Sequence, residues 1–475
     1  MNSNSQNKII IFWALFLIMN SPLFSNHPFR ISFQSDFSYY NSQPFWLKSN
    51  RWGINDGYIR NRLLIRYENQ KNNLIKSNAE MVQVKNRIYI IEGNISVSLQ
   101  KYLISFGISK KALGEIDHDL SSGSLILSPN ASPLPKFSIE SNEPTSFELE
   151  PFRFDFYGGI SHGLLEKGVY ISRPFIHEKW GYVKIIKNNL SFHLGLIHEA
   201  IWGGETKEFG TIPSTISDFM RVFFVQGGKE NATANERKNA LGNHLGIWDL
   251  GFSKEDKNYI FKTYLQHPFE DQSGARWILN WQDGLYGIKI EDKLKRFYIN
   301  KINFEFLYTM NQSGSREVSD STYGWDDYYN HYIYLSGWTN KGRTIGTPFA
   351  TLGSNQARPF LHIENNRIKA FHLGFSGEIN SKISFRYLSS YSENYGTFFD
   401  RNRLEDLNIN YKYSSKIIQY SSMLEIEIDN FMENDNLSCS LLYAYDNGEL
   451  FPISSGIEFS LTNGILDVFK PLFAK

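Results

Sequence analysis

Apolar and polar residues alternate without a break in several segments of this chain. In the clearest run, Leu424, Ile426 and Ile428 alternate with acidic residues. Successive side chains of a strand point to opposite faces, so such a run predicts a strand with one apolar wall and one polar wall. The pattern indicates an all-β chain. It is typical of a soluble sandwich, in which the apolar wall is core, and of a membrane barrel, in which that wall faces lipid. It recurs in three further segments: 302–308, 407–413 and 95–99.

Residues 1–25 have the composition of an export signal. Lys8 precedes an uninterrupted apolar run over residues 9–19, and a polar stretch follows up to Ser25. A charged start, an apolar segment and a cleavage region occur in this order in signal peptides, and the run is too short to span a bilayer as a helix. We therefore predict a signal peptide over 1–25. No linker composition divides the rest, so we expect one domain over 26–475.

No other segment is long and apolar enough for a membrane helix, so a membrane location requires strands. The 37 Phe, 27 Tyr and 10 Trp are many for a chain with so little continuous hydrophobicity. Outer-membrane barrels place aromatic residues at both interfaces, although soluble carbohydrate-binding proteins are also rich in them. Together with the leader, these features predict a transmembrane antiparallel β-barrel in the outer membrane of a Gram-negative bacterium. At about 20 to 25 residues for each strand and its connection, the length supports about 16 to 20 strands.

Charge and reactive residues exclude several classes of function. Lysine plus arginine and aspartate plus glutamate both number 49, so the basic bias of a nucleic-acid binder is absent. His193 and His198 are five residues apart, which places them on opposite faces of a strand and argues against a metal site with Glu199. Glu425 and Glu427 share one strand face and are better interpreted as lumen-lining charges than as a glycosidase pair. We expect no catalysis, no metal and no cofactor.

Two stretches interrupt the strand pattern. Residues 109–123 have a helical composition, and residues 213–224 predict a short helix with Pro213 in its first turn. That helix is expected to bury Ile216, Phe219, Met220 and Phe223. Both stretches are candidates for plug, loop or periplasmic helices. An irregular proline-containing connection is expected over residues 128–135.

Turn dipeptides predict the hairpins. Asp283-Gly284 is expected to join strands at 277–282 and 285–290, and Asn447-Gly448 is expected to follow a strand at 441–446. Another hairpin is expected between 371–376 and 382–388. The end of the chain contains Pro471, which suits a strand interior badly, so residues 456–462 are expected to form the closing strand.

Six irregular strings resemble, in the same order, those of the capsule assembly protein Wzi family. The resemblance runs from about residue 38 to about residue 400. It implies a barrel of about eighteen antiparallel strands with a small helical element on the periplasmic side. It also implies a lectin-like role in holding capsular polysaccharide. The strings are QPFWLKSNRWGI at 43–54, GSLILSPNASPLPK at 123–136, HEAIWGG at 198–204, DFMRVFF at 218–224, YYNHYIYLSGWTNKGRTIGTPF at 328–349 and SYSENYGTF at 390–398.

Sugar binding requires flat aromatic faces for C–H surfaces and planar amide, carboxylate or guanidinium groups for hydroxyls. The segment 323–338 supplies this mixture, and residues 50–52 carry a smaller version of it. An aromatic girdle beside a loop would have the same composition. The candidate carbohydrate-binding residues are Trp325, Asp327, Tyr328, Tyr329, His331, Trp338, Arg343 and Trp52.

We therefore expect a non-enzymatic outer-membrane protein that binds or organises capsular or extracellular polysaccharide at the cell surface. Its expected partners are that polysaccharide, outer-membrane lipid and polysaccharide export machinery, and no nucleic acid. The alternative is a porin or substrate-specific channel, which would share every strand feature. The lumen separates the two: plug material should close a lectin-like barrel, whereas a channel should keep an open, charged path.

Overall fold

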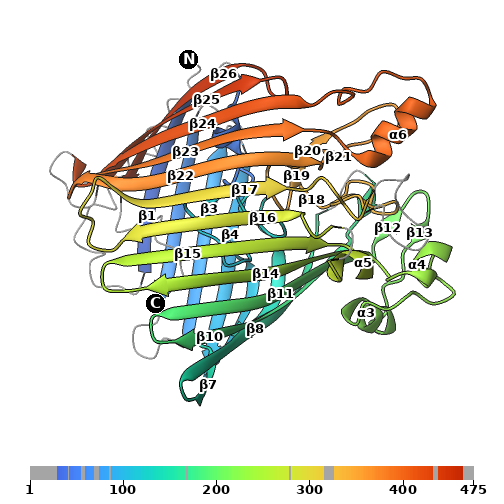
Figure 1. Cartoon of the computed structure of the whole chain (residues 1–475), viewed down its shortest axis with the longest axis horizontal. Helices are drawn as coiled ribbons and strands as arrows, with labels where there is room; N and C mark the ends of the chain where they lie inside the picture. The colour runs from blue at the N-terminus through green and yellow to red at the C-terminus, as the bar shows by residue number, and fades with distance from the viewer. Residues whose placement is uncertain are drawn as a thin grey trace.

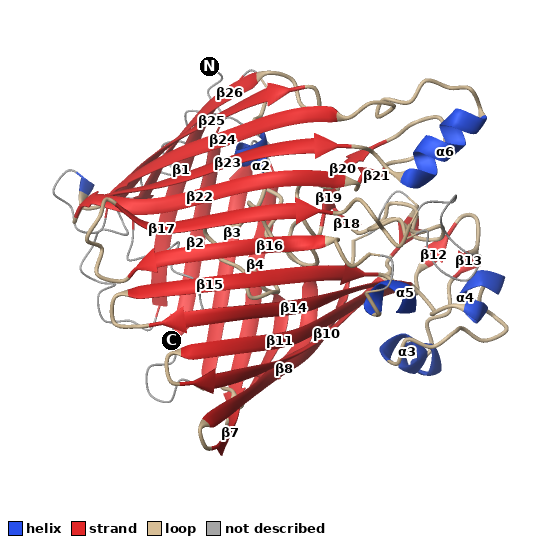
Figure 2. Cartoon of the chain, in the orientation of Figure 1, coloured by secondary structure: helices blue, strands red, loops and turns tan. Residues whose placement is uncertain are grey.

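The computed structural model of the chain is a closed antiparallel β-barrel (Figures 1 and 2). It describes residues 29–40, 42–54, 59–68, 74–84, 87–166, 170–277, 280–314, 326–431 and 437–463. The predicted signal peptide at 1–25 lies outside these residues and stays a prediction.

Strands of 5 to 13 residues form the barrel wall. They are β1 (Phe29–Tyr40), β2 (Ile59–Glu68), β3 (Ile75–Val84), β4 (Arg87–Leu99), β5 (Tyr102–Ile108), β6 (Pro135–Ser141), β7 (Thr145–Leu149), β8 (Phe152–Leu164), β10 (Phe175–Lys187), β11 (Leu190–Trp202), β14 (Asn243–Glu255), β15 (Tyr259–Phe269), β16 (Gly284–Asp292), β17 (Ile299–Tyr308), β22 (Ile368–Asn380), β23 (Ile383–Asn394), β24 (Ile417–Ile428), β25 (Leu437–Gly448) and β26 (Ser454–Asn463).

The sheet closes because β1 pairs with β2 on one side and with β26 on the other. Strands β6 and β7 both pair with β8 and follow each other along it, so they are two halves of one interrupted strand. The 19 strands of the sheet therefore make an 18-strand barrel, as expected. The closing strand expected over 456–462 is β26, which confirms that prediction.

The two faces of the wall follow the sequence alternation. On β17, Ile302 and Phe304 are exposed on the outside, whereas Asn303 and Glu305 are buried inside. On β24, Leu424 is exposed and Glu425 faces inward, where it binds Arg386 of β23. An apolar outer face and a polar inner face are the arrangement that a lipid environment requires.

Connections differ in length at the two ends of the barrel. At one end they are short turns, such as the one between β10 and β11. At the other end they are long and carry the helices and short strands (Figure 2). In outer-membrane barrels the long loops are extracellular. The connections of this end contain α2 (Phe45–Lys48), β9 (Ile171–Ser172), β12 (Glu205–Thr206), β13 (Gly210–Thr211), α3 (Ile216–Phe223), α4 (Ala234–Lys238), α5 (Gln272–Ala275), β18 (Thr339–Asn340), β19 (Arg343–Thr344), β20 (Thr351–Gly353), β21 (His362–Asn365) and α6 (Phe398–Asp406).

The helices differ from expectation in two respects. Helices α3, α4, α5 and α6 lie at the long-loop end and α2 lies inside the barrel, so none of these described α-helices lies on the periplasmic side. Residues 109–123 are irregular rather than helical, because ion pairs and hydrogen bonds to the wall replace helical hydrogen bonds there. The predicted helix at 213–224 is present as α3, with Thr215 as N-cap and Pro213 before it. However, Ile216 and Met220 are exposed rather than buried.

Two predicted strands are loop segments. Residues 407–413 follow α6, and their alternating Tyr411 and Tyr413 pack with Leu404 beneath an extracellular loop. Residues 277–282 lie in the loop after α5, so Asp283-Gly284 does not join two strands. The hairpin of β22 and β23 is confirmed. Asn447-Gly448 ends β25 rather than forming the turn, which follows at residues 449–453.

The main hydrophobic cluster lies inside the barrel and above its mouth, not between two sheets. It joins α2, residues 113–134 and residues 328–350 to inward-facing wall residues. A smaller cluster lies elsewhere, between α3, the loop 228–241 and the ends of β10 and β11.

Candidate functional site

Residues 109–134 form a plug that fills part of the lumen, and Glu305 of β17 is its most heavily bonded anchor. The Glu305 carboxylate accepts hydrogen bonds from Ser121 Oγ at 2.5 Å, from Ser122 N at 2.7 Å and from Ser122 Oγ at 2.5 Å. Tyr264 donates a fourth at 2.5 Å. Hydrogen bonds to an ionised acceptor are the strong kind, so this contact fixes the plug to the wall.

Other anchors are distributed around the wall. Asp249 of β14 accepts from Glu115 N at 2.8 Å, and Gln266 of β15 accepts from Leu125 N at 3.0 Å. On β22, Gly374 faces Leu120 so closely that a Cβ would lie 2.4 Å from the Leu120 carbonyl oxygen. Five ion pairs join plug and wall: Lys110–Glu80, Lys111–Glu140, Lys262–Glu115, Lys289–Asp117 and Lys301–Asp119.

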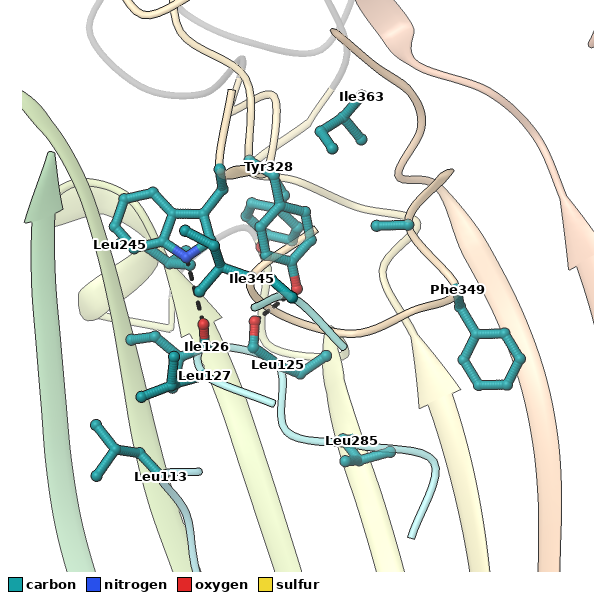
Figure 3. Close-up of a cluster of buried hydrophobic side chains, with 14 of the residues drawn as sticks. Leu113, Leu125, Ile126, Leu127, Leu245, Leu285, Tyr328, Ile345, Phe349 and Ile363 are labelled. Atoms are coloured by element: carbon teal, nitrogen blue, oxygen red, sulfur yellow. Dashed lines mark hydrogen bonds between the residues drawn. The ribbon is translucent and has the colours of Figure 1, made fainter. Parts of the chain in front are cut away.

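The loop 326–350 covers the plug from the extracellular side (Figure 3). Tyr329 donates its hydroxyl to Leu125 O at 2.8 Å, and Trp338 donates its indole N–H to Ile126 O at 3.3 Å. These bonds satisfy plug carbonyls that lie where water does not reach. Three of the strings that resemble the Wzi family, at 43–54, 123–136 and 328–349, thus meet in the lumen and at its mouth.

The structure places three candidate sugar-binding aromatics in this core. Tyr329 is 3% exposed and Trp338 is 0% exposed. Tyr328 is also buried, and its hydroxyl donates a hydrogen bond to Asp283 Oδ2 at 2.9 Å. None of the three presents a ring face to solvent in this structure, and their stacking on sugars stays a prediction. A glycan site and the core of a plug have the same aromatic and polar composition, which is why composition did not separate them. Trp325 lies outside the described residues.

Asp327 and His331 lie at the same loop but closer to the surface. Asp327 forms an ion pair with Arg358 and accepts from Asn330 and Asn366 side chains at 3.1 and 2.7 Å. His331 accepts from Ile333 N through Nδ1 at 3.2 Å. Both side chains are partly exposed, so they remain candidates for polar contacts to a ligand.

Trp52 contacts the loop end of the plug, and Arg343 contacts α2. Trp52 donates its backbone N–H to Pro129 O at 2.5 Å, and its ring packs on a small apolar cluster that includes Val82. Arg343 donates to Lys48 O at 3.2 Å. Both side chains are partly exposed.

Sequence reasoning did not single out the exposed aromatic residues of the long-loop end. The ring of Tyr332, 38% exposed, packs edge-on against Phe209 at 6.2 Å and lies 4.7 Å from His331. The hydroxyls of Tyr332 and Thr233 lie 2.6 Å apart. Phe209, His331 and Tyr332 are called the aromatic rim below. Tyr332 belongs to the aromatic segment that the sequence indicated, but no sequence signal separates it from its buried neighbours.

Acidic side chains gather beneath the same loop. Burial, then the charges of Asp271 and Asp283, raises the pKa of Asp326 to about 8. Burial raises the pKa of Glu270 well above its usual range, with Asp326 and Asp327 adding to the shift. Burial also raises the pKa of Asp283 to about 6. The raised pKa values of Asp326 and Glu270 favour their protonated forms, which limits charge repulsion under the loop.

Groups suited to catalysis or metal binding do not converge. Within the described ranges, no group of three or more His, Cys, Asp and Glu side chains is arranged to hold a metal ion. His193 contacts Asp249 inside the barrel and His198 contacts His244 outside, as the five-residue spacing predicts. Ser390 Oγ and His372 Nδ1 lie 2.8 Å apart. However, the other ring nitrogen of His372 is hydrogen-bonded to Leu120 O of the plug, and both side chains are buried.

Comparisons with known proteins agree with this architecture. The family model of the capsule assembly protein Wzi matches residues 28–354, more than half of the chain. The Wzi protein of Escherichia coli is described as an outer-membrane protein involved in group 1 capsule assembly and as a carbohydrate-binding β-barrel. It aligns with a TM-score of 0.58 and 14% identity, over 92% of this chain and 84% of that chain.

Two other solved structures align less closely. OprD of Pseudomonas aeruginosa gives a TM-score of 0.46 at 10% identity, over 92% of this chain and 94% of that chain. OpdQ of the same organism gives a TM-score of 0.44 at 10% identity, over 92% of this chain and 97% of that chain. No curated protein matches the sequence. In the described part of the chain, none of the helices has the length and apolarity to cross a membrane. The family match, with the fold that accompanies it, shows that this outer-membrane protein belongs to the Wzi family of capsule assembly proteins.

Proposed function

We propose that this protein binds capsular polysaccharide at the extracellular end of its barrel and holds it at the cell surface. The observation that carries the proposal is the plug, because a lumen filled by residues 109–134 and covered by residues 326–350 suits a surface receptor better than a pore. Family membership and the carbohydrate binding ascribed to the Escherichia coli protein support the same function.

The aromatic rim is the proposed sugar contact. Tyr332 and Phe209 offer apolar ring surface at the long-loop end, and His331 adds polar nitrogens beside them. Asp327 and its partner Arg358 supply the planar charged groups that sugar hydroxyls require. Trp52 and Arg343, named on the same chemical grounds, are proposed as further contacts.

The plugged lumen has a consequence for partners. A polysaccharide that cannot pass through this barrel must reach the surface by another route, so polysaccharide export machinery is the proposed source of the ligand. The protein is proposed to do no chemistry on the sugar, since the Ser390–His372 pair has no access to substrate. A diffusive channel would need a continuous wet path, which the anchored plug opposes.

Capsule retention tests the rim directly. In cells that lack the native copy, Tyr332→Ala should release several-fold more capsule into the medium than the wild type, because a sugar-stacking ring contributes on the order of 1 kcal/mol or more. Tyr332→Phe keeps the ring and removes only the hydroxyl contact with Thr233, so it should retain capsule. Heat-modifiable migration on gels verifies that each variant is a folded barrel.

Phe297 serves as the matched control, because it is an exposed aromatic in the short turn between β16 and β17 at the opposite end. Phe297→Ala should leave capsule retention unchanged. Normal retention by a folded double variant, Tyr332→Ala with Phe209→Ala, would remove the rim from the binding site. Steady ion conductance by the wild-type barrel in planar bilayers would instead favour a channel.

A further inference from the structure

An apolar groove of about 770 Å³ runs along the outside of the barrel wall. It crosses the neighbouring strands β5, β6, β8, β10 and β11. Its flanks include Tyr102, Phe137, Ile160 and Leu196, all of them exposed on the outer face. The groove therefore opens toward the lipid and not into the lumen.

Two glycines form the floor of this groove. Gly158 of β8 and Gly181 of β10 are directly opposite each other in the strand pairing. On β10 the even-numbered neighbours point inward, where Tyr182 binds Asp249, so Gly181 belongs to the outer face. A Cβ added at Gly181 would meet nothing within 4 Å. The missing side chains hollow a wall that is otherwise lined by large apolar residues.

Helix α3 and one lysine close the extracellular end of the groove. Phe219 of α3 lies in the groove lining, with its ring 5.3 Å from His162 and 5.2 Å from His177 on the outer wall. Lys179, two positions from Gly181 on the same face, donates to Phe223 O and lies 4.6 Å from the Phe223 ring. Lys179 therefore places a positive charge where the apolar floor ends.

The outer surface of α3 continues the apolar wall. Ile216 is 85% exposed, and Met220, Phe224 and Val225 are also exposed, although a helix in water would turn such residues inward. The exposed side thus extends the lipid-facing surface of β8 and β11 to the loop region. An apolar helix face of this kind lies stably at a membrane interface.

We propose that this groove binds a phosphorylated glycolipid of the outer leaflet, with one acyl chain along the glycine floor and a phosphate at Lys179. Continuity with the lipid-facing wall indicates an acyl chain, and the lysine at the extracellular end complements an anionic headgroup. The volume falls in the range of pockets that hold ligands, about 300 to 1,000 Å³. Phe223 O takes one of the three ammonium donors of Lys179, and a phosphate takes others.

The experiment measures bound lipid on the full-length barrel, extracted from outer membranes in mild detergent and analysed by native mass spectrometry. The wild type should retain about one phosphorylated glycolipid per barrel. Gly181→Leu should fill the floor and reduce retention at least fivefold, and Lys179→Gln should reduce it comparably. Lys179→Arg should restore it, because the charge returns.

Two control variants lie on the same face of β10. Lys187→Gln removes an outward lysine at the opposite end of the strand, and Val183→Leu enlarges the next outward residue beyond the groove. Both should retain lipid like the wild type. Gly181→Leu keeps the test valid if Lys179 variants disturb α3, because it enters open space. Equal retention by folded Gly181→Leu, retention of detergent alone by the wild type, or equal loss in Lys187→Gln would each overturn the proposal.

Discussion

The inner and outer faces of the wall formed by β8, β10 and β11 both carry polar side chains, but they satisfy them differently. Inside, Glu178 binds Lys136 and Ser161, so charge meets opposite charge. Outside, the rings of His162 and His177 are covered by aromatic residues of α3. A polar group on either face of a membrane strand needs a protein cover. Neighbouring strands and the plug supply it inside, and the α3 loop supplies it outside.

Breaking the inner cover should have the largest effect. Glu305→Leu removes the acceptor for Ser121, Ser122 and Tyr264, and each buried donor left unsatisfied costs about 1 to 3 kcal/mol. We expect a lower urea midpoint of unfolding and intermittent ion conductance through the loosened plug in planar bilayers. Glu255→Gln, at an exposed position in the short-turn region, is the control and should change neither. An unchanged midpoint without conductance would show that the plug does not depend on this anchor.

The lipid-facing wall is tested by charge insertion. Phe304 is exposed in the middle of β17, so Phe304→Arg should destabilise the barrel by about 2 to 4 kcal/mol. Phe297→Arg, in the turn before that strand, should cost about 0 to 1 kcal/mol because it lies at the interface. Denaturant unfolding in lipid vesicles measures both. Equal costs would contradict the assignment of the outer face at Phe304.

A smaller effect separates buried from exposed tyrosines. Tyr329→Phe removes the hydroxyl that binds Leu125 O, and it should lower the unfolding free energy by about 1 kcal/mol, because the plug carbonyl loses its partner. Tyr332→Phe at the exposed rim should lower it by much less, since water replaces the contact. The same unfolding assay compares the two variants. A larger loss of unfolding free energy in Tyr332→Phe than in Tyr329→Phe would contradict the assignment of Tyr329 to the core and of Tyr332 to the exposed rim.

The smallest effect is a pH dependence of the loop over the plug. The folded-state pKa of Asp326, about 8, lies above its unfolded value, so its contribution to stability is complete below about pH 4 and is lost as pH rises through 8. Limited proteolysis of residues 326–367 should therefore accelerate between about pH 5 and about pH 8 and level off above it. Asp326→Asn should remove this dependence, whereas Asp256→Asn, at an exposed turn, should preserve it. A pH-independent rate in the wild type would contradict the shift.

Most of the barrel was predictable from local pattern. Alternation at 302–308, 424–429 and 95–99 predicted strands and their lipid-facing sides, and the closing strand was placed correctly. Lipid imposes the same rule on every spanning strand, so each strand repeats the signal independently. The run at 407–413 has the same alternation but packs as a loop. The alternation of apolar and polar residues indicates which side chains are covered, but it does not indicate which part of the chain covers them.

The candidate site was only partly predictable. The sequence indicated the segment 323–338 as a unit, yet Tyr329 and Trp338 are core while Tyr332 is exposed. All three are aromatic residues in one short segment, and burial depends on contacts with Leu125 and Ile126, which are about two hundred residues away in sequence. The glycine floor at Gly158 and Gly181 likewise depends on the pairing of two strands.

The sequence by itself therefore determined the class of fold, the sidedness of the strands and the family, because these depend on short-range periodicity and on irregular local strings. Only the tertiary structure decided that residues 109–134 plug the lumen, that the aromatic segment divides into a core and a rim, and that α3 covers the outer wall. Each of these depends on which distant residues meet. The physical reason is that a polar or aromatic side chain has the same local signature whether solvent, lipid or another part of the chain covers it.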